Sequence, residues 1–262
     1  MQPAVSVLVG YLLMMKIESD SPRPSIFLFC NHGFGLPFTL GILWRTRRRA
    51  DVTLVYSKRL IPRPMGTFVR FHWRQLRFFV IRTVVNFLAR LADARVLNVT
   101  DVNARQFLSI VPVHCHGIVA GFGQIFSHPA IETFQSLVNF HPSVLPLYRG
   151  AIPSYWVLKN HEKRSGYTLH RIVERIDAGE VLYQGVVDCS RIKSVSGLNR
   201  KIAFASIGTL DSYLRHILDD AAWTSVTLNA REIYRVWLDY GRRPEESWTA
   251  AARTGLVTMG KP

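Results

Sequence analysis

Short apolar runs recur through the first 140 residues, separated by stretches long enough to form helices. They lie at Ile26–Cys30, Val52–Tyr56, Gly117–Gly121 and Leu137–Phe140. Continuous apolar runs are typical of parallel strands, because helices on both faces of a parallel sheet bury both sides of each strand. The pattern therefore predicts a doubly wound α/β domain with a mostly parallel sheet.

The pattern changes after residue 166. Two runs, Tyr167–Val173 and Val181–Asp188, read as strands on either side of the turn-like segment Asp177–Gly179, which predicts a hairpin. The segment Ser196–Asp220 then carries apolar residues at near-helical spacing. We expect one closing helix there, packed on the sheet.

A further helix is predicted at Arg74–Asp93, where an apolar stripe is interrupted by Arg77, Arg82 and Arg90. These charges argue against a membrane span. Packing of the apolar stripe on the sheet is the commoner use of such a helix. A position on a membrane surface or against a partner remains the alternative.

The chain contains no repeat or linker that would divide it, so we expect one domain at residues 25–225. Residues 1–24 are predicted to be an N-terminal extension and residues 226–262 a short C-terminal one. The apolar stretch Val5–Met15 is too short to span a membrane and has no Lys or Arg before it, unlike a secretion signal. Three scattered cysteines fit a reducing, cytoplasmic location.

The charge is strongly positive, with 33 Lys and Arg against 18 Asp and Glu in 262 residues, a net +15. Most of the excess lies in residues 1–100. A polyanionic partner such as nucleic acid, an anionic membrane or a phosphorylated substrate would be attracted to this charge. A solvated surface without a partner explains the charge equally well.

Candidate chemistry concentrates in Val138–Gly150. Asn139 and His141 are two residues apart in a strand-like run, so their side chains share one face. An amide and an imidazole side by side can donate hydrogen bonds to a developing oxyanion. A carboxylate could orient the imidazole, and Asp177 is a candidate. A hydrogen-bonded strand end and an ordinary turn are the alternative readings.

The segments VNFHPSVLPLYRG and SGYTLHRIVERIDAGEVLYQ resemble the signature of the folate-dependent formyltransferases, which act on glycinamide ribonucleotide, methionyl-tRNA and amino sugars. The similarity is strongest over residues 112–190. It implies a Rossmann-like formyltransferase core with a C-terminal hairpin and a closing helix. The matching positions are Asn139, His141, Pro142, Ser143, Leu145, Pro146, Arg149, Gly150, Asp177 and Gly179.

The resemblance also implies the residues' roles. The donor would be 10-formyltetrahydrofolate, and Asn139, His141 and Asp177 would be the catalytic triad. Asn139 and protonated His141 would stabilise the oxyanion formed when an amine attacks the formyl carbon, while Asp177 would hold His141 and relay a proton. The pterin pocket would comprise Gly123, Gln124, Ile125, Phe126, Val173, Glu174, Arg175 and Ile176. Ordinary core packing is the alternative for Ile125, Phe126 and Ile176. The acceptor side would comprise Ser143, Tyr148, Arg149 and Gly150, and Leu145–Pro146 matches a cis position of the family.

The chain departs from the pattern of the family at two places that bear on which acceptor it uses. Cys30–Gly35 is not the phosphate loop of the glycinamide ribonucleotide enzymes, and about 40 residues after the domain cannot form the C-terminal barrel of the methionyl-tRNA enzymes. The segment YTLHRIVERIDAGEVLYQ resembles the sugar formyltransferases more than the other members of the family. The resemblance therefore implies a nucleotide-linked amino sugar as the acceptor, with hydroxyornithine and glycinamide ribonucleotide as alternatives. A non-catalytic polyanion-binding module on the same scaffold is the alternative of another class.

The remaining expectations concern partners and metals. His114-Cys115-His116 lacks further ligands at convincing spacing, so no metal is expected. We expect no nucleic-acid partner, no membrane span, and a homodimer.

Overall fold

The computed structural model describes residues 23–31, 36–58 and 68–219. Some of the sequence predictions lie outside these ranges. They concern most of the N-terminal extension, residues 32–35 of the segment after the first strand, and the C-terminal extension at 226–262. The predicted domain limits at 25 and 225 stay predictions.

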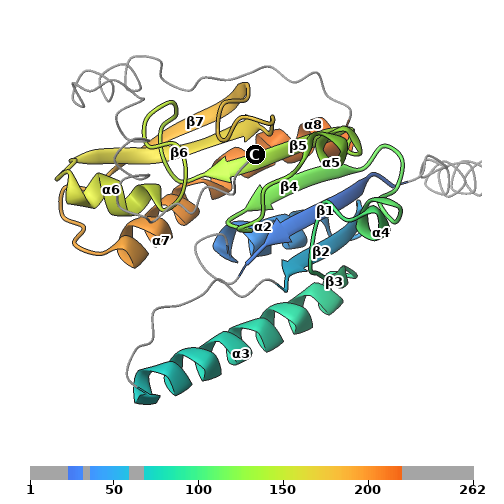
Figure 1. The fold of residues 1–262 in the computed structure, drawn as a ribbon, viewed down its shortest axis with the longest axis horizontal. Helices are drawn as coiled ribbons and strands as arrows, with labels where there is room; N and C mark the ends of the chain where they lie inside the picture. Colours follow the sequence, from blue (N-terminus) through green and yellow to red (C-terminus); the bar gives the residue numbers. More distant parts are fainter. Residues whose placement is uncertain (1–22, 32–35, 59–67, 220–262) are drawn as a thin grey trace, which may run out of the picture.

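A seven-stranded sheet forms the centre of the described chain, in the order β3-β2-β1-β4-β5-β6-β7 (Figure 1). β1 to β5 are parallel, and β6 and β7 are antiparallel to their neighbours. This confirms the α/β class, the mostly parallel sheet and the C-terminal hairpin. The strands are β1 (Ser25–Cys30), β2 (Asp51–Ser57), β3 (Arg95–Val99), β4 (His116–Ala120), β5 (Ser136–His141), β6 (Arg164–Arg171) and β7 (Val181–Asp188).

The predicted strand limits differ from the observed ones mainly in the hairpin. β7 has the predicted bounds, but β6 begins at Arg164 and ends at Arg171, whereas the prediction was Tyr167–Val173. Arg171 forms the last pair of β6 with β5, opposite Val138. Beyond it the chain leaves the sheet to make the connection to β7. β3 was not predicted.

Helices cover both faces of the sheet, and each face has its own core. Ile26 and Leu28 of β1 pack with α2, α7 and α8, whereas Phe27 and Phe29 pack on the other side with α4 and α5. Successive residues of β1 thus enter opposite cores, which explains its unbroken apolar sequence. The helices are α2 (Leu36–Thr46), α3 (Phe68–Leu91), α4 (Arg105–Leu108), α5 (His128–Glu132), α6 (Pro153–Lys159), α7 (Val195–Ala205) and α8 (Ile207–Asp219).

The single closing helix predicted at Ser196–Asp220 is wrong. The chain forms two helices, α7 and α8, that meet at Ser206. At this junction the Ser206 hydroxyl donates to the Ala203 carbonyl, and the Tyr167 hydroxyl donates to the Ala205 carbonyl. Side-chain donors therefore occupy carbonyls that a continuous helix would use, which periodicity alone does not reveal.

α3 packs on the sheet through a narrow band only. Among its described side chains, Val85 and Ala89 are buried, whereas Val80, Phe87 and Leu91 are at least half exposed. The predicted packing of the apolar stripe on the sheet is therefore seen for one edge of the stripe only. In the described part of the chain, no helix combines the length and apolarity that crossing a membrane requires.

Candidate active site

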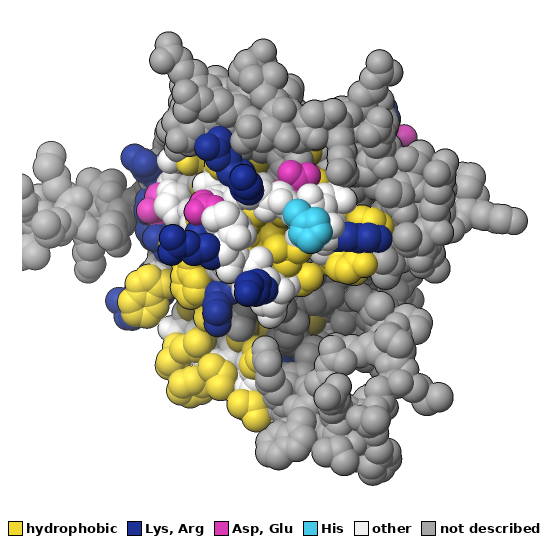
Figure 2. All heavy atoms as spheres, turned by 90° about the vertical axis from the view of Figure 1, so that its left-hand side faces the viewer, with side chains coloured by type: hydrophobic (Ala, Val, Ile, Leu, Met, Phe, Trp, Pro, Cys, Tyr) yellow, Lys and Arg dark blue, Asp and Glu magenta, His cyan; other side chains and the backbone are white. Residues whose placement is uncertain are grey.

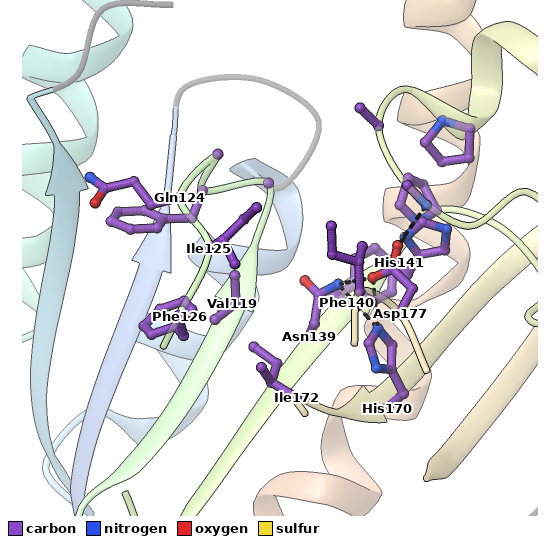
Figure 3. Close-up of a pocket in the computed structure, with 18 of the residues that line it drawn as sticks. Val119, Gln124, Ile125, Phe126, Asn139, Phe140, His141, His170, Ile172 and Asp177 are labelled. Atoms are coloured by element: carbon purple, nitrogen blue, oxygen red, sulfur yellow. Dashed lines mark hydrogen bonds and ion pairs between the residues drawn. The ribbon is translucent and has the colours of Figure 1, made fainter. Parts of the chain in front are cut away.

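A cavity of about 650 Å³ opens at the carboxyl ends of the central strands. Its walls come from the loop after β4, the end of β5 with the following loop, and the connection between β6 and β7 (Figure 3). The carboxyl edge of an open α/β sheet is where ligands generally bind in this architecture. A volume between about 300 and 1,000 Å³ suits a small-molecule ligand.

β5 places two of the predicted catalytic residues on this cavity. Asn139 and His141 both line it, and His141 is the last residue of the strand. Pro142 follows and disfavours helical geometry at His141. The strand therefore places both side chains on the same face, as predicted.

Asp177 connects the polar groups of the site (Figure 3). Its Oδ1 lies 3.3 Å from Asn139 Nδ2 and 3.4 Å from His170 Nε2, and its Oδ2 lies 3.4 Å from His141 Nδ1. Oδ2 also accepts a hydrogen bond from the Gly150 N–H at 2.8 Å. The three residues of the predicted triad thus meet in one place, although Asp177 comes from a loop remote in sequence from β5.

The surroundings of His141 define which of its nitrogens can titrate. Its Nε2 is 2.9 Å from the Tyr148 carbonyl oxygen, which can only accept, so Nε2 carries a proton. Nδ1 faces the Asp177 carboxylate. Proton gain and loss at His141 therefore occur at Nδ1, in contact with Asp177.

Burial and charge oppose each other at this pair. Burial lowers the pKa of His141 and outweighs the Asp177 carboxylate, which raises it; His170 and Arg149 lower it further. Burial alone would raise the pKa of Asp177, but His141, His170 and the Gly150 N–H together hold it well below its usual range. Asp177 is thus a carboxylate at neutral pH, beside a histidine whose neutral form is favoured.

His170 is a further polar residue of the site that we did not single out from the sequence. It lies opposite Asn139 in the β5–β6 register, is 1% exposed, and has its Nε2 3.2 Å from Asn139 Nδ2. Its Nδ1 donates to the Arg171 carbonyl at 2.9 Å. Antiparallel partners point to the same face, so the pairing of the two strands was the signal that could have identified it.

The predicted acceptor-side residues separate into two groups. Gly150 lines the cavity, but Ser143, Tyr148 and Arg149 do not. Ser143 donates to the Leu147 carbonyl at 2.7 Å, and the Tyr148 hydroxyl donates to Glu162 at 2.5 Å. These side chains therefore stabilise the loop that follows β5. The Leu145–Pro146 bond in this loop is cis, as predicted.

The predicted pterin-side residues form the opposite wall, with Arg175 alone away from the cavity. Ile125 and Val173 are 64% and 42% exposed, so they offer apolar surface to a ligand. Phe126 is buried in the core of the α4–α5 face. The Gln124 side chain accepts from the Val102 N–H and donates to Ser57, which fixes the loop. Recognition of a flat ring on this wall would come from Ile125, Val173 and backbone groups.

The His114-Cys115-His116 segment lies away from this cavity, at the start of β4. The His116 Nδ1 is 2.8 Å from the Ser136 hydroxyl, and Cys115 is buried. Among the residues that the structure describes, no three His, Cys, Asp or Glu side chains are grouped as metal ligands would be.

Comparison with known proteins relates this fold and site to a family. The family described as Formyl transferase matches residues 115–211, which include all three triad positions. The bifunctional polymyxin resistance protein ArnA of Wigglesworthia glossinidia brevipalpis is 41% identical over 80 residues, 30% of this chain and 12% of that protein. A methionyl-tRNA formyltransferase of Lactococcus lactis subsp. cremoris (strain SK11) is 30% identical over 119 residues, 44% of this chain and 37% of that protein.

Solved structures share the fold at low identity. A phosphoribosylglycinamide formyltransferase from Anaplasma phagocytophilum superposes with a TM-score of 0.56 at 18% identity, covering 76% of this chain and 88% of that one. WlaRD, a sugar 3N-formyl transferase solved in the presence of dTDP and 5-N-formyl-THF, gives 0.53 at 19% identity, covering 80% and 71%.

The fold and the site define a Rossmann-like α/β protein with an Asn–His–Asp centre at the carboxyl edge of its sheet. Residues 115–211 match the formyl transferase family, and the chain shares the fold of solved formyltransferases. It spans 12% and 37% of the length of the two curated relatives above.

Proposed function

We propose that this protein transfers a formyl group from 10-formyltetrahydrofolate to the primary amine of a small acceptor, an amino sugar linked to a nucleotide. The observation that carries the proposal is the convergence of Asn139, His141 and Asp177 at one cavity. The family match of the segment that holds these residues supports the same reaction.

The cavity suits a folate co-substrate. One wall offers Ile125 and Val173 as exposed apolar surface beside the backbone of the loop after β4, and apolar walls with a few polar groups are typical of cofactor sites. When bound, 10-formyltetrahydrofolate would supply an electrophilic formyl carbon.

The polar residues would then act as follows. Asn139 donates an amide N–H to the oxygen on which negative charge develops, as donors do in an acyl-transfer site, once Nδ2 exchanges its contact with Asp177 or His170. Both nitrogens of His141 face protein acceptors, so donation from His141 to that oxygen requires that its contact with Tyr148 or Asp177 be exchanged. Asp177 accepts the proton released by the attacking amine, directly or through His141 Nδ1, and the proton passes to N10 of the folate as the bond between N10 and the formyl carbon breaks.

The acceptor is proposed from the family. Its members are named for tRNA, ribonucleotide and sugar acceptors, and one sugar enzyme was solved with dTDP. Hydroxyornithine and glycinamide ribonucleotide remain the alternative acceptors. We place the reaction in the cytoplasm, because the three cysteines are free and buried, and we expect a homodimer.

A panel assay tests the proposal. The protein is incubated with 10-formyltetrahydrofolate and nucleotide-linked amino sugars, glycinamide ribonucleotide or hydroxyornithine, and tetrahydrofolate release and acceptor mass are followed. We expect one amino-sugar nucleotide to be formylated by the wild type and not by His141→Ala. If no acceptor gains a formyl group, or if His141→Ala is as active as the wild type, the proposed function is wrong.

The non-catalytic alternative makes the opposite prediction. A polyanion-binding module on this scaffold would bind nucleic acid or anionic vesicles with a steep salt dependence, and Asn139→Ala would leave that binding unchanged. Absence of turnover together with such binding would favour this alternative.

A further inference from the structure

The two sides of the cavity differ in charge. The segments 149–161 and 189–201, which include α6 and most of α7, contain six Lys and Arg and no Asp or Glu. The segments 121–134 and 172–177, which form the apolar wall, contain three Asp and Glu and one Arg. Figure 2, which turns the carboxyl edge of the parallel strands toward the viewer, shows Lys and Arg side chains gathered on this face. An anionic group would therefore favour the α6–α7 side.

Two of these basic residues are available to a ligand. Lys193 immediately precedes the N-cap of α7, and Arg200 lies in the helix; both are exposed. Within the described residues neither forms an ion pair with a carboxylate. Arg191 and Lys201 lie near the Asp188 carboxylate, and Lys201 donates to the Asp188 carbonyl. Lys193 and Arg200 thus contribute unneutralised positive charge on the α7 side, and Lys159 of α6, which lies over the Trp156 ring, adds to it.

Asn199 connects this basic surface to the cavity. It lines the cavity from α7, next to Arg200, and its Oδ1 accepts from the Ser154 hydroxyl of α6, which is itself 1% exposed. The acceptor atom of the amide is therefore occupied. In the described part of the chain its Nδ2 has no hydrogen-bond partner, so the group that Asn199 offers to a ligand is a donor.

We propose that Asn199, Lys193 and Arg200 form a phosphate subsite that binds the phosphate group of the formyl acceptor. A site composed of one neutral donor and two cations selects an anion with several oxygen acceptors, as a diphosphate has. The proposal rests on the proposed function, since it assigns this surface to the acceptor. The acceptor's amine would then extend from the α6–α7 side toward Asn139, with the pterin on the opposite wall.

Binding measurements test the subsite without turnover. Inorganic pyrophosphate and UDP are titrated into the wild type and into Lys193→Glu/Arg200→Glu, and 5-formyltetrahydrofolate is titrated into the same samples. The matched control is Arg90→Glu/Arg95→Glu, which makes the same charge change at exposed positions near the amino ends of β2 and β3. We expect the first variant to weaken UDP and pyrophosphate binding by at least about tenfold, equivalent to about 1.4 kcal/mol, and the control to change it by less than about twofold.

A conservative variant tests the contribution of the Asn199 amide separately from that of the Lys193 and Arg200 charges. Asn199→Asp keeps an acceptor for the Ser154 hydroxyl but replaces the free N–H with carboxylate charge. We expect it to weaken UDP binding by about tenfold or more and to leave 5-formyltetrahydrofolate binding unchanged. In the formyl-transfer assay it should raise the acceptor's KM more than it lowers kcat.

Three results would overturn the subsite. The first is equal binding of pyrophosphate and UDP, or no binding, in the wild type and in Lys193→Glu/Arg200→Glu. The second is weaker 5-formyltetrahydrofolate binding in that variant, which would assign the residues to the folate's glutamate. The third is far tighter binding of a short RNA hairpin than of UDP, lost in the same variant, which would indicate a nucleic-acid surface. Anion binding that depends on these residues in a protein without formyl transfer would instead refute the proposed function alone.

Discussion

The carboxylate of Asp177 accepts a hydrogen bond from the Gly150 N–H at 2.8 Å, across 27 residues of sequence. This contact joins the loop after β5 to the connection between β6 and β7. Gly150 has a φ of 90°, a conformation that L side chains rarely adopt. The same carboxylate faces Asn139, His141 and His170. One side chain therefore positions the donors of the site and the loop beside them.

Replacing Asp177 with Asn tests this arrangement. The amide keeps an oxygen that can accept from Gly150, but it removes the negative charge and directs an NH₂ group toward other donors. We expect kcat to fall by about 100- to 10,000-fold, the range for loss of a general acid–base group, with the far-UV circular dichroism spectrum unchanged. If Asp177→Asn retained full turnover, the role proposed for the carboxylate would be wrong.

His170 is predicted to act by positioning. His170→Gln removes the Nδ1–H bond to the Arg171 carbonyl and the contact with Asn139 and Asp177. We expect kcat to fall by about 100-fold, as for a small displacement of catalytic groups, with KM little changed and the pH dependence of kcat shifted. His161→Asn, at an exposed position that does not line the cavity, is the control. Unchanged kcat and pH dependence in His170→Gln would exclude the positioning role.

The contrast between Asn139 and His170 shows what the sequence could predict. Asn139 and His141 stand in one recognisable motif, and the period of a strand is enough to place them on one face. His170 has no motif around it, and its place follows only from its register opposite Asn139. β3 was missed for a similar reason. It is a short edge strand, Arg95–Val99, with a mixed exposed and buried pattern, so it lacks the apolar run that identified its neighbours.

Gly179 is expected to be essential to the geometry near His170. A Cβ at residue 179 would lie 1.9 Å from the Arg171 carbonyl oxygen, which accepts the Nδ1–H of His170. Because backbone must move to admit it, we expect Gly179→Ala to destabilise the protein by about 1–3 kcal/mol, the range for overpacking, and to lower kcat. Urea unfolding measures the first effect.

Gly208→Ala is the control for this substitution. Gly208 lies in α8, and a Cβ there meets nothing within 4 Å. Alanine favours a helix over glycine by up to about 1 kcal/mol, so this variant should be at least as stable as the wild type. Equal stability of Gly179→Ala and the wild type would mean that the connection between β6 and β7 relaxes without cost.

The free energy of unfolding should decrease with acidification in two stages. Burial lowers the pKa of His141 and of His116, the latter with help from His216 and His114. Below about pH 6.5, the usual pKa of histidine, the unfolded chain therefore binds protons that the folded chain does not, and stability is lost at up to about 1.4 kcal/mol per pH unit for each histidine. The pKa of Asp177 is also lowered in the folded protein, but its usual value is far below that of histidine, so its contribution to stability is lost in a second stage, only as the pH falls below about 4.

His116 allows the first stage to be tested away from the active site. Asn at residue 116 can still hydrogen-bond the Ser136 hydroxyl, which lies 2.8 Å from His116 Nδ1, but it does not titrate. We expect urea unfolding of His116→Asn between pH 8 and pH 5 to give a shallower loss of stability than the wild type. His161→Asn, at an exposed position with a φ of 56° that Asn tolerates, should leave the slope unchanged. If the free energy of unfolding of His116→Asn depended on pH as steeply as that of the wild type, proton uptake on unfolding would not involve His116. His116 would then not cause the loss of stability.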